Sequence, residues 1–182
     1  MIRKFTFLLV ASFSIVLVSC SGDATEQIKN ERTKQIDFSR FTPFNLRPYG
    51  INADIQLPDS TTVYGNSNTW RVEHELDEFD WKIILADDFK ILIEDWGQEN
   101  GIAHYSQQIE ANEKAEVLEK SDSFLSYRLY VSDSNKELTK THLFQQVNID
   151  GIEYVFRTDI DGCSPETTTY IKTALKSMGN TK

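Results

Sequence analysis

Two neighbouring segments, 81–86 (WKIILA) and 89–94 (FKILIE), are apolar on both faces of an extended chain. Successive side chains of a β-strand point to opposite faces, so a strand with one solvated face alternates apolar and polar residues. Here both sets of positions are apolar: Trp81, Ile83 and Leu85 alternate with Ile84 and Ala86, and Phe89, Ile91 and Ile93 alternate with Leu92. We therefore predict a hairpin, turning at Asp87-Asp88, at the centre of a sheet that is covered on both faces.

Five further segments alternate apolar and polar residues with the period of two that is typical of half-buried strands. They are 51–57, which Pro58 ends, 70–76, 123–132, 141–149 and 152–158. Asp150-Gly151 joins the last two and is the strongest hairpin signal in the chain, because a two-residue type I′ turn needs positive φ at both positions. Residues 38–49 are rich in Phe and are interrupted by prolines, so we expect them to stay extended and to pack against the edge of the domain.

Two segments have the spacing of helices. The first runs to about Asn112, and its apolar residues recur at i, i+3 and i+7: Ile102, Tyr105 and Ile109. The second begins after Ser164, a suitable N-cap, with Pro165 at the first helical position and Glu166 in the first turn. The buried residues of this second helix are expected to be Ile171, Ala174, Leu175 and Met178, and Gly179 is placed to end it.

These elements predict an α+β fold: a mainly antiparallel sheet of about six to seven strands, joined by short hairpins, with two helices. Their order is marked by Gly50-Ile51 and Leu57-Pro58, by Trp81, Phe89-Lys90-Ile91 and Ile93, by Val147 and Tyr154-Val155-Phe156, and by Ala174-Leu175-Lys176-Ser177-Met178. Over about residues 41–179 this order resembles the PsbP-like family of small α/β/α sandwiches. The resemblance implies a scaffold that holds a partner, and its motifs include no catalytic signature.

The first twenty residues have the layout of a bacterial export signal. A basic start, Arg3 and Lys4, precedes fourteen uncharged residues, 5–18, which are too few to span a membrane but enough for the apolar region of a signal peptide. Leu17-Val18-Ser19-Cys20 then resembles the lipobox of bacterial lipoproteins. The resemblance implies cleavage before Cys20, a diacylglyceryl thioether on its sulfur and a third acyl chain, such as palmitate, on its amine. An ordinary signal peptide cleaved near Ser19 and an uncleaved anchor helix remain alternatives.

The chain accordingly divides into a signal peptide, 1–19, an acylated Cys20 with a flexible polar tether, 20–40, and a single globular domain, 41–182. Cleavage leaves 163 residues, enough for one core, and removes two basic residues, so the formal charge falls from −9 to −11. This acidity argues against nucleic acid as a partner. Because two or more acyl chains hold a protein firmly on a bilayer, we expect a lipid-anchored protein of the bacterial cell envelope, on the periplasmic or surface face of the outer membrane.

None of the familiar motifs for hydrolysis, nucleotide binding or zinc is present in the sequence. His74, His104 and His142 fall on separate elements, and a zinc site from all three is not expected. Asp159-Ile160-Asp161-Gly162 resembles the start of a calcium loop, but the twelfth position is Tyr170 rather than an acid, so we interpret it as a turn before the last helix. We therefore predict no catalytic residue, no metal and no cofactor.

Cys163 has no partner for an intramolecular disulfide if Cys20 carries lipid. Free cysteine is commonly buried and inert, so we predict a shielded thiol rather than one that pairs between molecules.

Two functions remain open. The first is a non-catalytic binding or interaction module, held on membrane lipid through acylated Cys20, with a protein or small molecule as partner. The second is a small envelope hydrolase or ligand-binding enzyme that uses His74 or His142 with a nearby carboxylate. The second function requires a pocket in which a histidine lies within hydrogen-bond reach of Asp or Glu.

Overall fold

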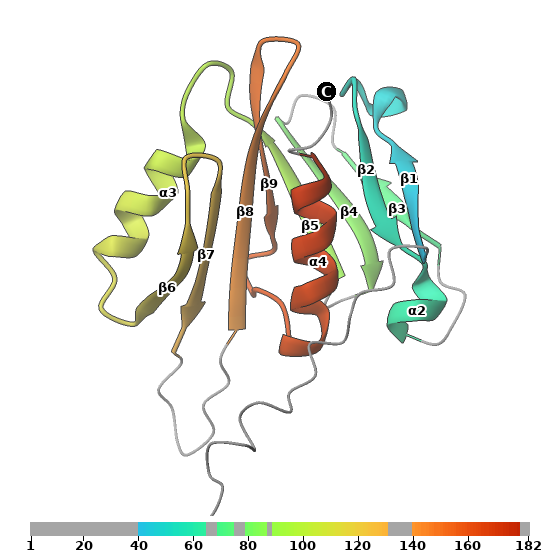
Figure 1. Cartoon of the computed structure of the whole chain (residues 1–182). Helices are drawn as coiled ribbons and strands as arrows, with labels where there is room; N and C mark the ends of the chain where they lie inside the picture. The colour runs from blue at the N-terminus through green and yellow to red at the C-terminus, as the bar shows by residue number, and fades with distance from the viewer. Residues whose placement is uncertain (1–39, 65–68, 75–78, 87–88, 131–139, 179–182) are drawn as a thin grey trace, which may run out of the picture. The chain divides into compact units, whose positions relative to one another are not determined.

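Seven strands form one antiparallel sheet in the order β3-β4-β5-β9-β8-β7-β6 (Figure 1). The computed structural model describes residues 40–64, 69–74, 79–86, 89–130 and 140–178, so the predicted signal peptide, Cys20, the tether and the turn at Asp87-Asp88 lie outside the described residues. The strands are β3 (Arg71–Glu73), β4 (Asp80–Ala86), β5 (Phe89–Asp95), β6 (Ala115–Lys120), β7 (Phe124–Leu129), β8 (Lys140–Ile149) and β9 (Ile152–Thr158). The predicted α+β class, with a mainly antiparallel sheet, is confirmed.

The centre of this sheet is β9, and the prediction that the β4–β5 hairpin lies there is wrong. β9 pairs with β5 along one edge and with β8 along the other. The hairpin itself forms as expected, with Trp81 opposite Ile93 and Ile83 opposite Ile91. Apolar residues at both sets of positions indicate that a strand is covered on both faces, but they do not show which other strands pair with it.

A second, two-stranded sheet consists of β1 (Phe41–Asn45) and β2 (Asp54–Pro58). The predicted strand 51–57 therefore exists, with Ile55 and Leu57 fully buried, but it does not belong to the main sheet. A short 3-10 helix, η3 (Arg47–Tyr49), connects the two strands, and α2 (Ser60–Tyr64) follows β2. The main sheet instead has β6 as its seventh strand, at the edge beside β7. The sequence did not indicate this strand, because most of its residues are exposed and do not alternate.

Adjacent residues of β9 face two different cores. Phe156 points into the larger core, which the main sheet shares with the β1–β2 sheet and α4 (Pro165–Met178). Val155 points into a smaller core beneath α3 (Gly101–Glu110), whose residues include Ile102, Ile109 and Leu125. Figure 1 shows α3 beside β6 and β7 and α4 in front of the middle of the sheet. α3 thus covers the second face over β6 to β9, whereas its main contacts include neither β4 nor β5, the strands whose apolar pattern predicts such a cover.

The predicted start and buried face of the C-terminal helix are confirmed. Ser164 Oγ accepts a hydrogen bond from the Thr167 N–H, and Pro165 is the first residue of α4. The buried residues include the four that the spacing predicts: Ile171, Ala174, Leu175 and Met178. The helix ends at Met178, and Gly179 lies outside the described residues. Among the helices in the described part of the chain, none combines the length and the apolar composition that crossing a bilayer requires.

The turn between β8 and β9 has the predicted geometry. Asp150 has φ of 54° and Gly151 has φ of 87°, and these positive values are those of a type I′ turn. The Asp150 carboxylate also accepts a hydrogen bond of 3.0 Å from Asn52 Nδ2, which ties the hairpin to the segment before β2.

Gly101, the first residue of α3, lies where a side chain has no room. A Cβ atom there would come 2.5 Å from Val155 Cγ2 and 3.0 Å from the Trp96 ring. We expect Gly101→Ala to lower the free energy of unfolding by about 1–3 kcal/mol, because the smaller core must open to admit the methyl group. Denaturant unfolding followed by circular dichroism measures this. Gln107→Ala, at an exposed site on the same helix, is the control and should change stability by less than about 0.5 kcal/mol; equal stabilities of the two variants would contradict the packing described.

Candidate functional site

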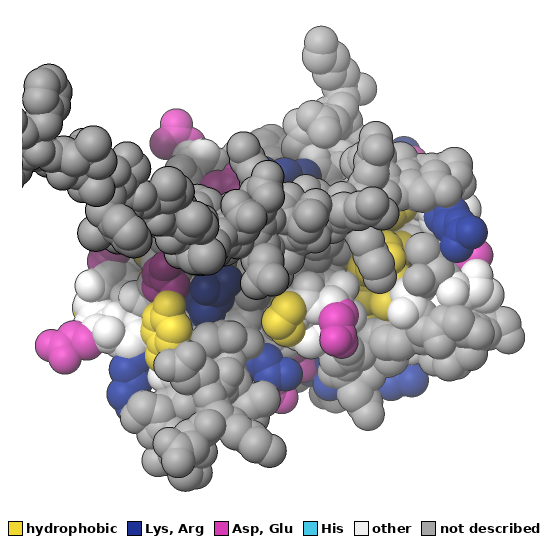
Figure 2. Space-filling view, turned by 60° about the horizontal axis from the view of Figure 1, so that its bottom comes forward, with side chains coloured by type: hydrophobic (Ala, Val, Ile, Leu, Met, Phe, Trp, Pro, Cys, Tyr) yellow, Lys and Arg dark blue, Asp and Glu magenta, His cyan; other side chains and the backbone are white. Residues whose placement is uncertain are grey.

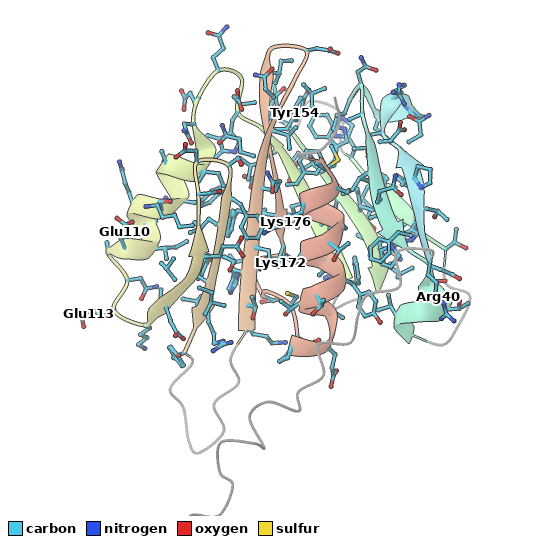
Figure 3. The ribbon with its side chains drawn as sticks, viewed as in Figure 1. Arg40, Glu110, Glu113, Tyr154, Lys172 and Lys176 are labelled. Carbon is cyan, nitrogen blue, oxygen red and sulfur yellow. The ribbon has the colours of Figure 1, made fainter. Side chains whose placement is uncertain are left out.

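A polar pocket of about 270 Å³ lies between strands β6, β7 and β8 and the N-terminal half of α4. Its floor is the sheet face that also carries Leu143 and Phe124, and its far wall is formed by Pro165, Thr168, Thr169 and Lys172 of the helix. Figure 3 shows Lys172 and Lys176 on α4 in front of β8. The pocket therefore sits where the helix begins to cover the sheet but does not fill the space above it.

Two buried hydroxyl groups line the floor of this pocket. Ser126 on β7 is 3% exposed and Thr141 on β8 is 6% exposed. They lie on one face of the sheet, because Ser126 pairs with Leu143 and Arg128 pairs with Thr141. Neither side-chain oxygen makes a hydrogen bond within the described part of the chain, and neither is closed off from the pocket, so both can meet water or a ligand there. These two groups are available to a ligand.

Charged side chains surround the same pocket. Glu119 on β6 accepts a hydrogen bond of 2.5 Å from Lys172 Nζ and one of 2.6 Å from Lys176 Nζ. These bonds, that to Lys172 first, hold the pKa of the Glu119 carboxyl below its usual value. Both lysines also lie over the Phe124 ring, at 5.6 Å and 4.6 Å from its centroid. The carboxylate is thus neutralised by two cations.

Arg128 supplies a third cation at the pocket. Its guanidinium lies 3.6 Å from the Glu116 carboxylate, which is an ion pair longer than a hydrogen bond. The guanidinium also contacts the Tyr130 hydroxyl, and because arginine has five N–H donors, some of them remain available. Figure 2, which brings the lower end of the molecule in Figure 1 forward, shows basic and acidic side chains interspersed rather than gathered by sign.

Cys163 lies behind the pocket, and its predicted shielding is confirmed. The thiol is 1% exposed, and Sγ donates to the Thr141 carbonyl oxygen at 3.2 Å. Thr168 Oγ1 lies 3.4 Å from the same sulfur. The backbone N–H of Cys163 also donates to the Thr141 carbonyl, so this residue connects the segment before α4 to the start of β8.

The three histidines lie apart, on different elements and with different neighbours. His74 is exposed, with Nδ1 2.8 Å from the Asp80 carbonyl oxygen, and its ring stacks on Trp81. His104 is exposed on α3, with Nε2 2.7 Å from Gln108 Nε2. In the described part of the chain, none of the three makes a hydrogen bond or ion pair with a carboxylate, and no cluster of three His, Cys, Asp or Glu side chains has the geometry of a metal site.

His142 is the one buried histidine of the three. It is 4% exposed on β8, and its ring stacks face to face on Tyr127 at 4.7 Å. Burial first, and then the nearby positive charge of Arg157, lowers the pKa of His142 to about 4, although Asp161 opposes the shift. The imidazole is therefore neutral at pH 7 and packs as an aromatic residue.

A charged network stands on the opposite face of the sheet, beneath α3. The Glu94 carboxylate accepts hydrogen bonds from Arg157 Nε at 2.7 Å, from Tyr105 Oη at 2.7 Å and from Trp96 Nε1 at 3.1 Å. Burial and the hydrogen bond to Glu94 raise the pKa of Tyr105 above its ordinary value. Because the acceptor positions of Glu94 are occupied by the protein's own donors, we interpret the network as a fastening between α3 and the sheet rather than a binding site.

The loop at Asp159 is a turn, as the sequence predicts. The Asp159 carbonyl accepts from the Gly162 N–H at 2.8 Å, and Gly162 has φ of 67°. The Asp159 carboxylate pairs with Lys90 at 3.4 Å.

Sequence reasoning did not find the residues of the pocket. Ser126 and Thr141 are polar residues at strand positions where the alternation of the sequence allows an apolar residue, and this was the available signal. The two residues indicate a pocket only once α4 is known to lie over the same face of the sheet.

Together these features define an α+β domain with both faces of its antiparallel sheet covered and a polar pocket beneath its C-terminal helix. No protein-family model, no curated protein and no solved structure matches the chain.

The burial of His142 generates a testable dependence of stability on pH. Its pKa is about 4 in the folded state and about 6.5 in the unfolded chain, so the unfolded state binds more protons between these values and stability falls as pH falls. From pH 8 to pH 5 this residue should cost about 2 kcal/mol of unfolding free energy. His142→Leu should lose that part of the pH dependence in urea titrations at both pH values. The exposed-site control His104→Gln should keep it, and identical pH profiles for wild type and His142→Leu would refute the assignment.

Proposed function

We propose that the protein is a lipid-anchored binding module of the bacterial cell envelope, with the lipid on Cys20 and the described domain as a non-catalytic receptor for a partner. The anchor is supported by the lipobox-like Leu17-Val18-Ser19-Cys20 and by the uncharged segment before it. Three acyl chains are more than enough to hold a protein on a bilayer, since two already give stable attachment. The outer membrane, on its periplasmic or surface face, is the proposed site.

The binding part of the proposal is carried by one observation, the pocket into whose floor the hydroxyl groups of Ser126 and Thr141 open. A concave site with a few convergent polar groups is the usual form of a small-molecule site. A hydrolase built on His74 or His142 would need a carboxylate beside the imidazole. The contacts of both residues within the described part of the chain include none, so no observation favours that alternative.

We also propose that the domain has the PsbP-like α/β/α arrangement. An antiparallel sheet with α3 on one face and α4 on the other supports this proposal, as does the hairpin of β8 and β9 directly before the terminal helix. The exposed edge of the sheet at β6 carries Glu116, Glu119 and Lys120 and a β-bulge, features that keep an edge from pairing with other chains. Such a domain can stand at a membrane surface as a single unit.

Cys20→Ala tests the anchor. We expect the variant to leave the membrane fraction or to accumulate as the uncleaved precursor, because neither the thioether nor the cleavage that follows it can form without the Cys20 sulfur. Cell fractionation followed by immunoblotting measures both outcomes, and mass spectrometry of the wild-type N-terminus should detect the acylated cysteine.

The matched control is Thr25→Ala, a change in the polar tether that should leave processing and membrane attachment unaltered. A Cys20→Ala protein that runs at mature size and stays in the membrane fraction would exclude lipid attachment at this residue. An unacylated first residue in the wild-type protein would do the same.

A further inference from the structure

We infer that the pocket beneath α4 binds a small hydroxylated carboxylic acid. In this arrangement the Arg128 guanidinium pairs with the carboxylate of the ligand, and the Ser126 and Thr141 hydroxyl groups bond its hydroxyl groups. The inference deepens the proposed binding role and rests on it, but it does not depend on lipid at Cys20.

The size of the pocket sets the size of the ligand. Pockets for drug-sized ligands measure about 300–1,000 Å³, and this one measures about 270 Å³. A compact metabolite fits such a volume, whereas a protein segment or a lipid chain does not. The ligand is therefore a small molecule of roughly the size of a dicarboxylic acid or a single sugar ring.

The floor of the pocket requires a polar ligand. Ser126 and Thr141 are buried and have no hydrogen-bond partner within the described part of the chain. A hydroxyl group both donates and accepts, so it can pair with a ligand hydroxyl in either direction. Both hydroxyl groups open into the pocket, so one ligand can reach them together.

The charges require an anion. Glu119 is the acidic residue on the pocket wall, and Lys172 and Lys176 already neutralise it. Arg128 lies 3.6 Å from Glu116 and also contacts the Tyr130 hydroxyl, and the remaining N–H groups of its planar guanidinium can form the two parallel hydrogen bonds that suit a carboxylate. Three cations, Lys172, Lys176 and Arg128, thus stand around the pocket with two carboxylates, Glu116 and Glu119.

The remaining wall is apolar and selects an organic anion over an inorganic one. Leu118, Leu143 and Pro165 face the same space as the hydroxyl groups. They can cover the carbon skeleton of a ligand, whereas inorganic phosphate has no apolar surface to bury against them.

The test uses the full-length protein purified in detergent and pairs of ligands that differ in charge. The pairs are D-glucuronate with D-glucose and L-malate with L-malamide, and inorganic phosphate is the third anion; thermal shift and calorimetry measure binding. We expect at least one acid to raise the melting temperature and to bind at least tenfold more tightly than its neutral counterpart or phosphate. The amide signals of Ser126 and Thr141 should shift in NMR spectra on addition of that acid.

Two variants locate the binding to the pocket. Arg128→Gln should weaken binding of the acid at least tenfold, whereas Arg71→Gln, which removes a comparable surface arginine paired with Glu73 at 3.2 Å, should not. Thr141→Val removes the hydroxyl group but keeps the shape of the side chain. Because the Thr141 hydroxyl has no partner in the protein, the variant should melt at the same temperature as wild type or higher, yet bind the acid more weakly.

Each opposite result overturns the inference. Binding of neither acid, equal binding of charged and neutral partners, tighter binding of phosphate, or unchanged binding by Arg128→Gln would each do so. Failure of this kind in a protein that still requires Cys20 for membrane attachment would refute the ligand class and leave the anchor standing. Binding of the acid by a wild-type protein whose mature N-terminus carries no lipid would refute the anchor and leave the pocket standing.

Discussion

Burial of β9 on both faces is the constraint on which the rest of the domain depends. Phe156 and Val155 are both fully buried although they point in opposite directions, so the sheet needs a cover on each side. α3 covers one side over β6 to β9, and α4 with the β1–β2 sheet covers the other. The two covers are fastened differently. Glu94 and Arg157 hold α3 through hydrogen bonds, whereas α4 is held mainly by its apolar stripe and the cap at Ser164.

The pocket is a consequence of how α4 lies on the sheet. The apolar stripe of the helix seats its second half firmly, with Ile171, Ala174 and Leu175 fully buried. Its first turn carries threonines and a proline instead, and the strands beneath present Ser126 and Thr141 rather than large apolar residues. Small polar side chains on both surfaces leave space that a core would otherwise fill. The lysines of the same helix reach sideways to Glu119 and set the charge of that space.

The two sheet faces therefore differ in what they offer to other molecules. Beneath α3, most polar groups have protein partners: Glu94 accepts from three side chains, and His142 is held neutral by burial next to Arg157, although the Ser106 hydroxyl is buried without a partner among the described residues. Beneath α4, the hydroxyl groups of Ser126 and Thr141 open into the pocket, and Arg128 stands at its rim beside Glu116 and Tyr130. We place the proposed binding on the α4 face because the pocket lies there. The packed sheet holds the residues of the pocket in place, and the space that α4 leaves above the sheet is the proposed binding site.

Local patterns in the sequence were enough to predict the α+β class, the Asp150-Gly151 turn, the cap and buried stripe of α4, and the shielding of Cys163. Each of these depends on residues close together in the chain, or on a residue's own preference for burial. The central position of β9, the separation of β2 into its own sheet and the existence of β6 depend on pairing between distant segments, about which alternation carries no information. The pocket belongs to this second group, because Ser126, Thr141, Arg128 and Lys172 come from three elements that only the packing of α4 on the sheet brings together.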